Sequence, residues 1–363
     1  MHYDFLNIVG LMTGTSMDGI DISLVQTNGL NLKRLHENYF YKYSPNTKKK
    51  LINILKQDIN FNLKRKKYLD EFITNEHYLA LKDLDIIKKS DLIGFHGQTI
   101  YHNSKQQISI QLGDPKKLSI LLNKNVIFDF RSNDILFGGQ GAPLAPVYHK
   151  YVIEQTNLEL PTCILNIGGI SNITYWDGYN LIGFDTGPGN ALMDDYMLAV
   201  LNKNFDEDGN IASSGYPIKD EIKKFLENDF FKQPPPKSLD RGAFLDTYEK
   251  LIKKKYSFKD VMATFAEFTI ETVASGIELL PKNVNNILIT GGGYKNIYLM
   301  KRLKERLKIN FIYETELGLN FDYIEAELIA YLSARSIYKL PFTFPSTTGV
   351  SKPLSGGKLY KCL

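Results

Sequence analysis

The pattern of hydrophobic and polar positions divides the chain into two halves that begin alike. In the first half, apolar runs and alternating stretches predict strands, and amphipathic spacings predict helices. The predicted order is strands at 6–11, 20–26 and 35–43, two helices between about 47 and 89, a strand at 92–95, a helix at 115–122 and a strand at 126–130. This order predicts a sheet that starts with a hairpin, and the helical segment at 47–89 is an insertion.

The second half repeats the hairpin start. Its predicted elements are strands at 162–167, 173–176, 181–184 and 286–290, followed by helices at 298–307 and 324–338. The string Gly-Phe, followed by a polar residue and a glycine-containing turn, occurs at 94–97 and again at 183–187, which predicts that these two strands are equivalent. We therefore predict duplicated α/β domains that face each other across a cleft.

Composition and charge narrow the class of protein. A chain of 363 residues exceeds the usual size of one hydrophobic core, which favours two domains. The 44 basic and 40 acidic residues nearly balance, so nucleic acid is not an expected partner. No apolar run approaches the ~18 residues of a membrane span and no signal peptide is evident, so no membrane partner is expected. Two cysteines without metal-type neighbours, Cys163 and Cys362, fit a reducing, cytoplasmic compartment.

The turn between the first two strands is a candidate phosphate-binding site. It contains Gly14, Thr15, Ser16, Met17, Asp18, Gly19, Ile20 and Asp21. Backbone N–H groups between glycines can converge on an anion, and hydroxyl and carboxylate side chains add ligands for phosphate and a metal ion. Asp18 and Asp21 are the candidate Mg²⁺ ligands, because Mg²⁺ takes one or two carboxylates together with phosphate oxygens. The alternative is a plain β-hairpin with turn-stabilising aspartates.

Asp185 is the candidate catalytic carboxylate. It follows an apolar strand and opens the string Asp-Thr-Gly-Pro-Gly. A carboxylate at a strand end can accept a proton from water or a hydroxyl group, while N–H groups of the turn, including Gly187, hold phosphate. The alternative is that Asp185 caps the helix predicted to start near 190, although Asn190 is better placed for that role.

Other motifs limit the possible chemistry. Gly291, Gly292 and Gly293 follow a predicted buried strand, which is where parallel α/β sheets bind nucleotides. His96 and His102 do not have the spacing of a zinc site. Gly-x-Ser-x-Gly, Gly-x-Gly-x-x-Gly after the first strand and Gly-x-x-x-x-Gly-Lys-Ser/Thr are all absent, which disfavours an α/β-hydrolase, a Rossmann dinucleotide site and a P-loop.

Together these features resemble the actin/hexokinase/Hsp70 ATPase superfamily and, within it, the anhydro-N-acetylmuramic acid kinase family. The resemblance covers essentially the whole chain in motif order. The motifs that carry it lie at 14–21, 94–99, 111–114, 129–131, 138–143, 165–172, 183–194, 235–238, 290–293 and 325–330. It implies two duplicated actin/hexokinase-like (ribonuclease H-like) α/β domains flanking an ATP cleft, with an N-terminal domain of residues 1–135 plus 340–363 and a C-terminal domain of residues 136–339.

The resemblance also implies an activity. Kinases of this family open the 1,6-anhydro bond of anhydro-N-acetylmuramic acid and phosphorylate its 6-hydroxyl with ATP and Mg²⁺, a step of cell-wall recycling. By resemblance, Asp185 activates water for attack on the anomeric carbon, residues 14–21 contact the ATP phosphates, and residues 291–293 lie near the nucleoside. Arg131 and Glu325 hold the sugar, and Arg131 is the natural partner for its lactyl carboxylate. A homodimer is compatible with this expectation.

Some positions depart from the family pattern, and other functions stay open. Ser132 and Asn133 stand where many relatives have arginines, which puts sugar contacts by those positions in doubt. Leu239 replaces a threonine after Pro-Pro-Lys-Ser, so the turn geometry there is open, and Glu327 replaces a small or apolar residue in a helix expected beside the adenosine. Glu325 itself could simply be a carboxylate favoured at a helix N-terminus. The remaining alternatives are an ATPase that controls a partner and a kinase for a different sugar.

Overall fold

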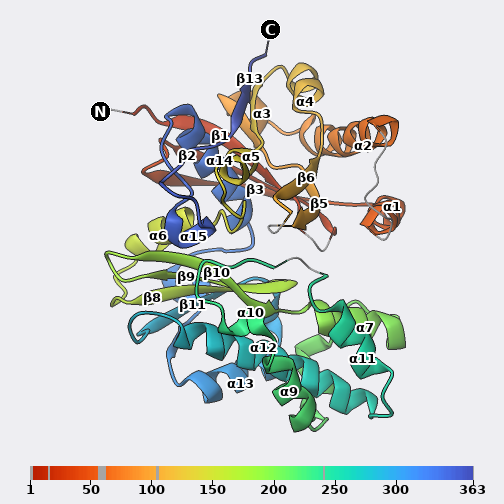
Figure 1. Cartoon of the computed structure of the whole chain (residues 1–363). Helices are drawn as coiled ribbons and strands as arrows, with labels where there is room; N and C mark the ends of the chain where they lie inside the picture. Colours follow the sequence, from red (N-terminus) through yellow and green to blue (C-terminus); the bar gives the residue numbers. More distant parts are fainter. Residues whose placement is uncertain (1–2, 15–16, 56–62, 104–105, 240–241, 363) are drawn as a thin grey trace. The chain divides into compact units, whose positions relative to one another are not determined.

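The chain forms two compact units (Figure 1). The computed structural model describes residues 3–14, 17–55, 63–103, 106–239 and 242–362. Unit 1 comprises Met1–Tyr151 and Asp322–Leu363, and unit 2 comprises Val152–Phe321. The predicted site residues Thr15 and Ser16 lie outside the described residues.

Unit 1 is built on a mixed sheet whose described strands run in the order β13-β7-β4-β1-β2-β3. The strands are Leu6–Met12 (β1), Gly19–Thr27 (β2), Leu32–Lys42 (β3), Leu92–Phe95 (β4), Asn125–Phe128 (β7) and Lys358–Tyr360 (β13). β1, β4 and β7 are parallel, whereas β2, β3 and β13 pair antiparallel with their neighbours. A separate hairpin consists of Gln98–Asn103 (β5) and Ile108–Leu112 (β6). The helices are Pro45–Leu55 (α1), Leu63–Leu81 (α2), Ile86–Lys89 (α3), Pro115–Leu122 (α4), Ser132–Leu136 (α5), Pro146–Glu154 (α6, which continues into unit 2), Ile324–Ile337 (α14) and Pro345–Thr348 (α15).

The assignment of α14 to unit 1 corrects the predicted domain boundaries. The predicted boundaries after residues 135 and 339 would place α6 and α14 in the C-terminal domain. In the structure the units divide after Tyr151 and Phe321. The physical reason is the close approach of α14 to β1, since a Cβ on Gly10 would lie only 1.9 Å from the carbonyl oxygen of Ala326. A glycine in β1 is therefore what allows α14 to lie directly on the sheet of unit 1.

Unit 2 has a second mixed sheet, with described strands in the order β10-β9-β8-β11-β12. The strands are Thr162–Ile167 (β8), Ile170–Trp176 (β9), Leu181–Pro188 (β10), Asn286–Thr290 (β11) and Asn310–Ile312 (β12). The α-helices are Ala191–Leu201 (α7), Asn210–Ser213 (α8), Lys219–Leu226 (α9), Asp229–Lys232 (α10), Leu245–Ile252 (α11), Phe258–Glu278 (α12) and Ile297–Leu307 (α13). Short 3₁₀ helices occur at Glu207–Gly209 (η1), Gly292–Lys295 (η2) and Glu314–Leu317 (η3).

The two sheets share one strand plan, which confirms the predicted duplication. In each, a hairpin and a third antiparallel strand lie on one side, and parallel strands follow on the other. By position, β10 of unit 2 corresponds to β3, and β11 corresponds to β4. The predicted equivalence of the strings at 94–97 and 183–187 was therefore wrong. Their likeness is local, because one ends a parallel strand and the other lies in an antiparallel strand.

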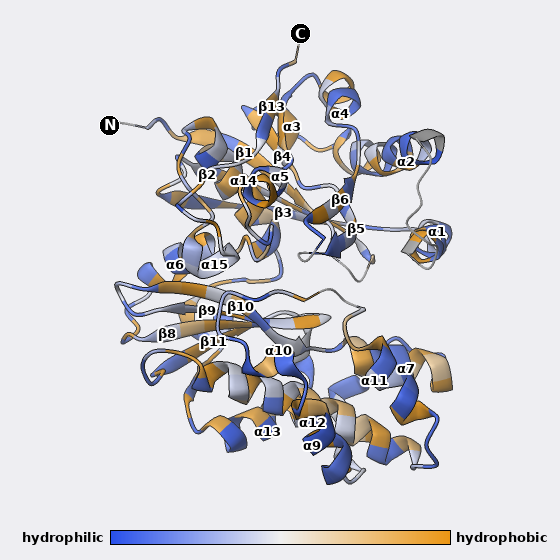
Figure 2. Ribbon diagram, in the orientation of Figure 1, coloured by the Kyte–Doolittle hydropathy of each residue, from blue (hydrophilic) through white to orange (hydrophobic). Residues whose placement is uncertain are grey.

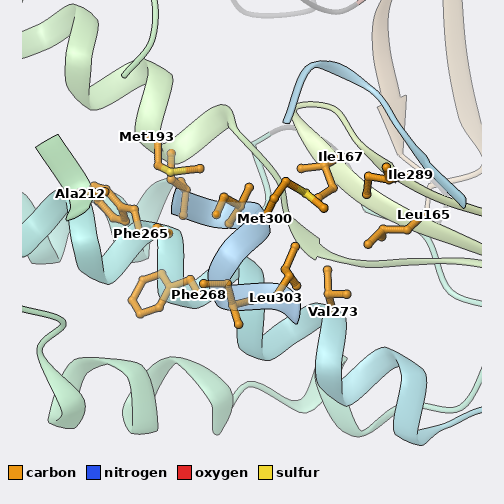
Figure 3. Packing of buried hydrophobic residues seen from close by; sticks show 14 of the residues in the cluster. Leu165, Ile167, Met193, Ala212, Phe265, Phe268, Val273, Ile289, Met300 and Leu303 are labelled. Carbon is orange, nitrogen blue, oxygen red and sulfur yellow. The ribbon is translucent and has the colours of Figure 1, made fainter. Parts of the chain in front are cut away.

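The core of unit 2 surrounds α12. Its side chains are buried along almost the whole helix, and Figure 2 shows apolar residues concentrated on α12 while α9 is largely hydrophilic. Figure 3 shows Phe265, Phe268 and Val273 of this helix packed among residues of β8, β11, α7, α8 and α13. Loss of a buried phenylalanine from such a core costs about 3–5 kcal/mol. None of the described helices, α12 included, is long and apolar enough to cross a membrane.

Candidate active-site residues of the two units

Buried side chains and hydrogen bonds to backbone carbonyl groups hold the turn between β1 and β2 in place. Met17 adopts a left-handed conformation with φ of 54°, and its N–H donates to Gly14 O at 3.3 Å. Its side chain is buried, as is that of Ile20, so both residues belong to the core of unit 1. Thr13 Oγ1 donates to Gly97 O at 2.9 Å, which fastens the start of the turn to the end of β4. Any contact of Met17 or Ile20 with phosphate therefore comes from the backbone.

Asp18 in this turn and Asp21 in β2 have different surroundings. The Asp18 carboxylate forms an ion pair with Lys48 and is half exposed. Asp21 is largely buried, and burial together with the charges of Glu325 and Asp322 raises its pKa to about 7. The structure thus places Asp21, but not Asp18, in a carboxylate cluster. Among the residues described, no group of three or more His, Cys, Asp or Glu side chains has the arrangement of a metal site.

Arg131 and Glu325 of unit 1 lie within electrostatic reach of each other. Burial raises the pKa of the Glu325 carboxyl, and the positive charge of Arg131 opposes that rise. Because the negative charge of Glu325 also raises the pKa of Asp21, these three predicted residues form one electrostatic cluster. Glu325 lies in the first turn of α14, where the helix dipole favours a carboxylate.

The Arg131 guanidinium is held by two acceptors that sequence reasoning did not connect with it. Its Nε and Nη2 donate to His96 Nε2 at 3.3 and 3.1 Å, and its Nη1 donates to Gly141 O at 2.6 Å. His96 directly follows β4 and is buried, and burial followed by the charge of Arg131 lowers its pKa to about 3. The only sequence signal for this contact is that both residues directly follow predicted strands.

The segment around Arg131, from Asp129 into α5, is fixed by the C-terminal tail of the chain. Asn133 Nδ2 donates to Ser355 O at 2.6 Å. Lys358, in the edge strand β13, forms an ion pair with Asp129 at 2.6 Å, and Asp129 Oδ1 accepts from Ser132 N at 3.2 Å. The positions where relatives have further arginines thus have structural roles here.

Glu327 forms a buried cluster within unit 1. Its carboxylate accepts from Arg34 Nε at 2.9 and 3.0 Å and from Tyr148 Oη at 2.5 Å. Only 3% of the Glu327 side chain is exposed, and the charge of Glu327 contributes to raising the pKa of Arg34. The expectation that Glu327 alters adenosine-side packing finds no support in these contacts. Its charge is instead compensated by Arg34 of β3.

Asp185 of unit 2 lies within β10 rather than in the turn after it. The predicted strand ended at 184, but the ladder with β9 continues to Pro188 with an irregularity between Asp185 and Gly187. Asp185 is 8% exposed, and the N-cap residue of α7 is Asn190 rather than Asp185. The side chain of Asn190 makes no capping bond to α7; its Nδ2 donates to Ile167 O at 3.3 Å. The capping alternative for Asp185 was therefore wrong.

The Asp185 backbone and carboxylate are bound by the segment around Lys237. Asp185 N donates to Lys237 O at 2.9 Å, and Leu239 N donates to Asp185 Oδ2 at 2.8 Å. The buried Lys237 ammonium in turn donates to Phe230 O at 2.9 Å, and its burial lowers its pKa to about 8. Because Leu239 uses its backbone N–H, replacement of the usual threonine leaves this contact in place. Neither Lys237 nor Leu239 was predicted to contact Asp185.

Three glycine-containing segments of unit 2 meet at the carboxyl ends of β8 and β11. They are residues 168–169, 187–189 and 291–293. A Cβ on Gly291, whose φ is +80°, would lie 2.2 Å from Asn166 Oδ1, and one on Gly293 would lie 2.3 Å from the Ile167 side chain. At Gly292 the nearest atom would be 3.9 Å away, so this glycine faces more open space. The predicted nucleoside-side glycines therefore lie beside the turn that joins β8 and β9.

The N–H groups of the turn at 187–190 are predicted to hold phosphate, and the structure shows other contacts for this segment. A Cβ on Gly187 would lie 2.4 Å from Thr272 Oγ1, so this glycine permits close packing of α12 on β10. The N–H groups of Gly189 and Asn190 donate to the carbonyl oxygens of Gly169 and Gly168, at 2.9 and 2.7 Å. These donors are thus engaged inside unit 2. The turn between β8 and β9 is the closer counterpart of the β1–β2 turn.

Comparison with known proteins gives matches over the whole chain. A family model described as anhydro-N-acetylmuramic acid kinase matches residues 6–362. The chain is 37% identical to the anhydro-N-acetylmuramic acid kinase of Rhodopseudomonas palustris strain BisB18, covering 98% of this chain and 99% of that protein. It is 36% identical to the protein of that name from Pelagibacter ubique, with the same coverages. Among solved structures, component A of (R)-2-hydroxyglutaryl-CoA dehydratase from Acidaminococcus fermentans matches with a TM-score of 0.44 and 11% identity, covering 91% of this chain and 99% of that one. The full-length matches to sequence relatives are the ones that show the family.

Proposed function

Because the chain belongs to the anhydro-N-acetylmuramic acid kinase family, we propose that it hydrolytically opens 1,6-anhydro-N-acetylmuramic acid and phosphorylates its 6-hydroxyl with ATP. The product is N-acetylmuramic acid 6-phosphate, and the reaction serves recycling of cell-wall sugars in the cytoplasm. The observation that carries the proposal is the nearly buried Asp185 carboxylate, held by the backbone of residues 237–239. A carboxylate fixed in this way suits a positioned general base.

We infer that Asp185 takes a proton from water as the water oxygen bonds to the anomeric carbon. As this bond forms, the bond between the anomeric carbon and the 6-oxygen breaks, and its electron pair stays on the 6-oxygen. That oxygen attacks the γ-phosphorus of ATP, and ADP leaves as the bridging bond breaks. Ring opening thereby supplies the alkoxide that phosphoryl transfer needs. The hydrogen bond from Leu239 N to Asp185 Oδ2 keeps the carboxylate in one orientation for the first step.

Binding of ATP is proposed to use the glycine-rich turns of each unit. In unit 1, Gly14, Asp18 and Gly19 belong to the β1–β2 turn and are proposed to face the phosphates. In unit 2, Gly187 and residues 291–293 are proposed nucleotide contacts. Because residues 291–293 have no side chains, other chain segments can come close to their backbone at the carboxyl ends of the parallel strands. Nucleotides bind at such strand ends, which supports the proposed contact.

Asp21 and Asp18 are the proposed holders of Mg²⁺. The raised pKa of Asp21 fits a cation partner, since a nearby divalent charge would favour the ionised carboxylate. Mg²⁺ needs only one or two protein carboxylates when phosphate oxygens and water complete its ligands. When bound, the ion would neutralise charge on the phosphates. Asp21 is the stronger candidate, because Asp18 is paired with Lys48.

Arg131 and Glu325 are the proposed sugar-binding residues. A guanidinium can bind a carboxylate through two parallel hydrogen bonds, which matches the lactyl group of the muramic acid. The structure supports this role by holding Arg131 in unit 1 between His96 and Gly141. Glu325 is partly buried, lies within electrostatic reach of Arg131 and can accept from a sugar hydroxyl group.

The proposal is tested by incubating the protein with ATP, Mg²⁺ and 1,6-anhydro-N-acetylmuramic acid in ¹⁸O-water and quenching early. Mass spectrometry is expected to find a phosphorylated sugar with one ¹⁸O atom at the anomeric position. Unlabelled N-acetylmuramic acid 6-phosphate, incubated for the same time, measures exchange of that oxygen with water. A phosphorylated sugar without label contradicts hydrolytic opening, and the absence of any phosphorylated sugar contradicts the assigned substrate.

A further inference from the structure

His96 is a buried histidine whose two ring nitrogens have distinct partners. Nδ1 lies 2.9 Å from Gly97 O, and a carbonyl oxygen can only accept, so Nδ1 carries the proton. Nε2 is then an acceptor, and it receives both Nε–H and Nη2–H of Arg131. The ring is therefore neutral and in a single tautomer.

A second contact fixes the other side of the guanidinium. Arg131 Nη1 donates to Gly141 O at 2.6 Å, and Gly141 N donates to the buried Asp134 Oδ2 at 2.7 Å. Asp134 Oδ1 also accepts from Thr348 Oγ1 at 2.6 Å, which ties this loop to α15. His96 and the anchored Gly141 carbonyl thus hold the guanidinium at separate nitrogens and define its plane.

The charged surroundings keep His96 in its accepting form. Burial and the positive charge of Arg131 both oppose protonation of the ring, and the nearby His77 acts in the same direction. His102 also feels Arg131, and burial and that charge lower its pKa to about 4. Glu325 faces Arg131 with the opposite sign. At neutral pH the imidazoles of His96 and His102 are therefore neutral, and Arg131 carries the positive charge beside them.

We propose that His96 is a positioning residue for sugar binding, which fixes the Arg131 guanidinium in the orientation that receives the lactyl carboxylate of the substrate. This inference rests on the proposed function, in which Arg131 binds that carboxylate. A guanidinium with one fixed orientation loses less conformational entropy when it forms two hydrogen bonds than a freely rotating one. His96 acts through Arg131 and takes no part in bond making or breaking.

The test compares two sugars, 1,6-anhydro-N-acetylmuramic acid and 1,6-anhydro-N-acetylglucosamine, which lacks the lactyl carboxylate. In His96→Phe, KM for the acidic sugar is expected to rise about tenfold, as for loss of a hydrogen bond to a charged group. Its kcat and the KM for the neutral sugar are expected to stay within about twofold. His96→Gln retains an acceptor and is expected to recover part of the loss.

Matched variants separate the possible outcomes. His77→Phe removes another buried histidine of unit 1 that does not hydrogen-bond to Arg131 and is expected to leave the ratio of the two KM values unchanged. If Arg131→Ala abolishes discrimination between the sugars but neither His96 variant changes it, the positioning role is wrong and the proposed function stands. If Arg131→Ala does not change discrimination, the carboxylate assignment of the proposed function fails as well.

A measurement on the unmodified protein covers the case in which His96→Phe does not fold. Nitrogen-15 NMR of the histidine rings is expected to show His96 neutral, with the proton on Nδ1, from pH 5 to pH 8. A protonated ring or the Nε2–H tautomer in this range would overturn the inference, since neither leaves an acceptor for Arg131.

Discussion

The two units hold their candidate site residues by different means. In unit 1, Arg131 is held by the side chain of His96 and by the carbonyl of Gly141, whose loop is anchored by the side chain of Asp134. In unit 2, Asp185 is placed by backbone groups of residues 237–239. A backbone clamp tolerates changes of side chain, whereas a side-chain network depends on the identity of each member. Substitutions should therefore affect the two units in different ways.

The largest expected effect is a loss of kcat when Asp185 of unit 2 is replaced. Asp185→Asn keeps the size of the side chain but removes the proposed base, so kcat is expected to fall by about 10²–10⁴. ATP binding, measured by calorimetry, is expected to persist. Asp246→Asn removes a largely exposed carboxylate of the same unit and serves as the control. Near-normal turnover of Asp185→Asn would contradict its role as a base.

The next largest effect is on stability, and it concerns Glu327 of unit 1, whose carboxylate is paired with Arg34. Glu327→Ala leaves the Arg34 guanidinium without its carboxylate partner, and breaking a buried ion pair costs about 3–5 kcal/mol. Hydrogen–deuterium exchange of α14 and β3 is expected to quicken accordingly. The double variant Arg34→Met with Glu327→Leu removes both charges and is expected to restore much of the protection. Equal exchange in the single and double variants would show that charge compensation is not the cause.

Asp21 is expected to make stability depend on pH, because burial and the charges of Glu325 and Asp322 raise the pKa of its carboxyl. Its pKa in the folded protein is about 7, against 3.8 as its ordinary value, so unfolding between these pH values releases a proton. The free energy of unfolding of the unmodified protein is therefore expected to fall relative to Asp21→Asn from pH 4 to pH 7, by up to a few kcal/mol, and to level off above pH 7. Denaturant titrations without Mg²⁺ measure this difference. Asp83→Asn, at an exposed site of the same unit, controls for the loss of one charge, and a difference independent of pH would contradict the assignment.

The smallest effect tests the backbone clamp itself. Leu239→Thr restores the residue usual in relatives and is expected to change kcat by no more than about twofold, because Leu239 N–H is the donor to Asp185. Leu239→Pro removes that N–H and is expected to lower kcat by about tenfold or more, as for a hydrogen bond to a charged group. Steady-state kinetics at saturating ATP distinguish the two variants. A large loss in Leu239→Thr would show that the side chain matters after all.

Much of the fold follows from local patterns in the sequence. The two hairpins, the strand at Leu92–Phe95, and the helix at Pro115–Leu122 have clear periodicity and Gly- or Pro-bounded ends, and the structure confirms them. α12 was not predicted, because its residues are buried on nearly all sides and show no amphipathic stripe. The end of β10 was missed because Gly187 and Pro188 suggest a turn, whereas pairing with β9 extends the strand.

The sequence singles out candidate site residues only where the type of one residue is enough to suggest a role. Asp21, Arg131 and Glu325 are charged residues in or beside predicted elements, and the structure brings them into one electrostatic cluster. The supports of that cluster depend on contacts between distant segments. His96 lies 35 positions from Arg131, and Lys237 contacts Asp185 across 52 positions, so no local spacing reveals either pair.

The C-terminal tail, which contacts Asn133 and Asp129 near Arg131, also determines the order in which the two units can finish folding during synthesis. Unit 2 is one continuous segment, Val152–Phe321, and can complete its sheet once that segment has left the ribosome. Unit 1 must wait for α14, which covers β1, and for β13, which pairs with β7 and places Lys358 beside Asp129. The half of the protein that is made first is therefore finished last. A nascent chain stalled before residue 322 would display a folded second unit and an incomplete first one, with the loop of Arg131 not yet fixed.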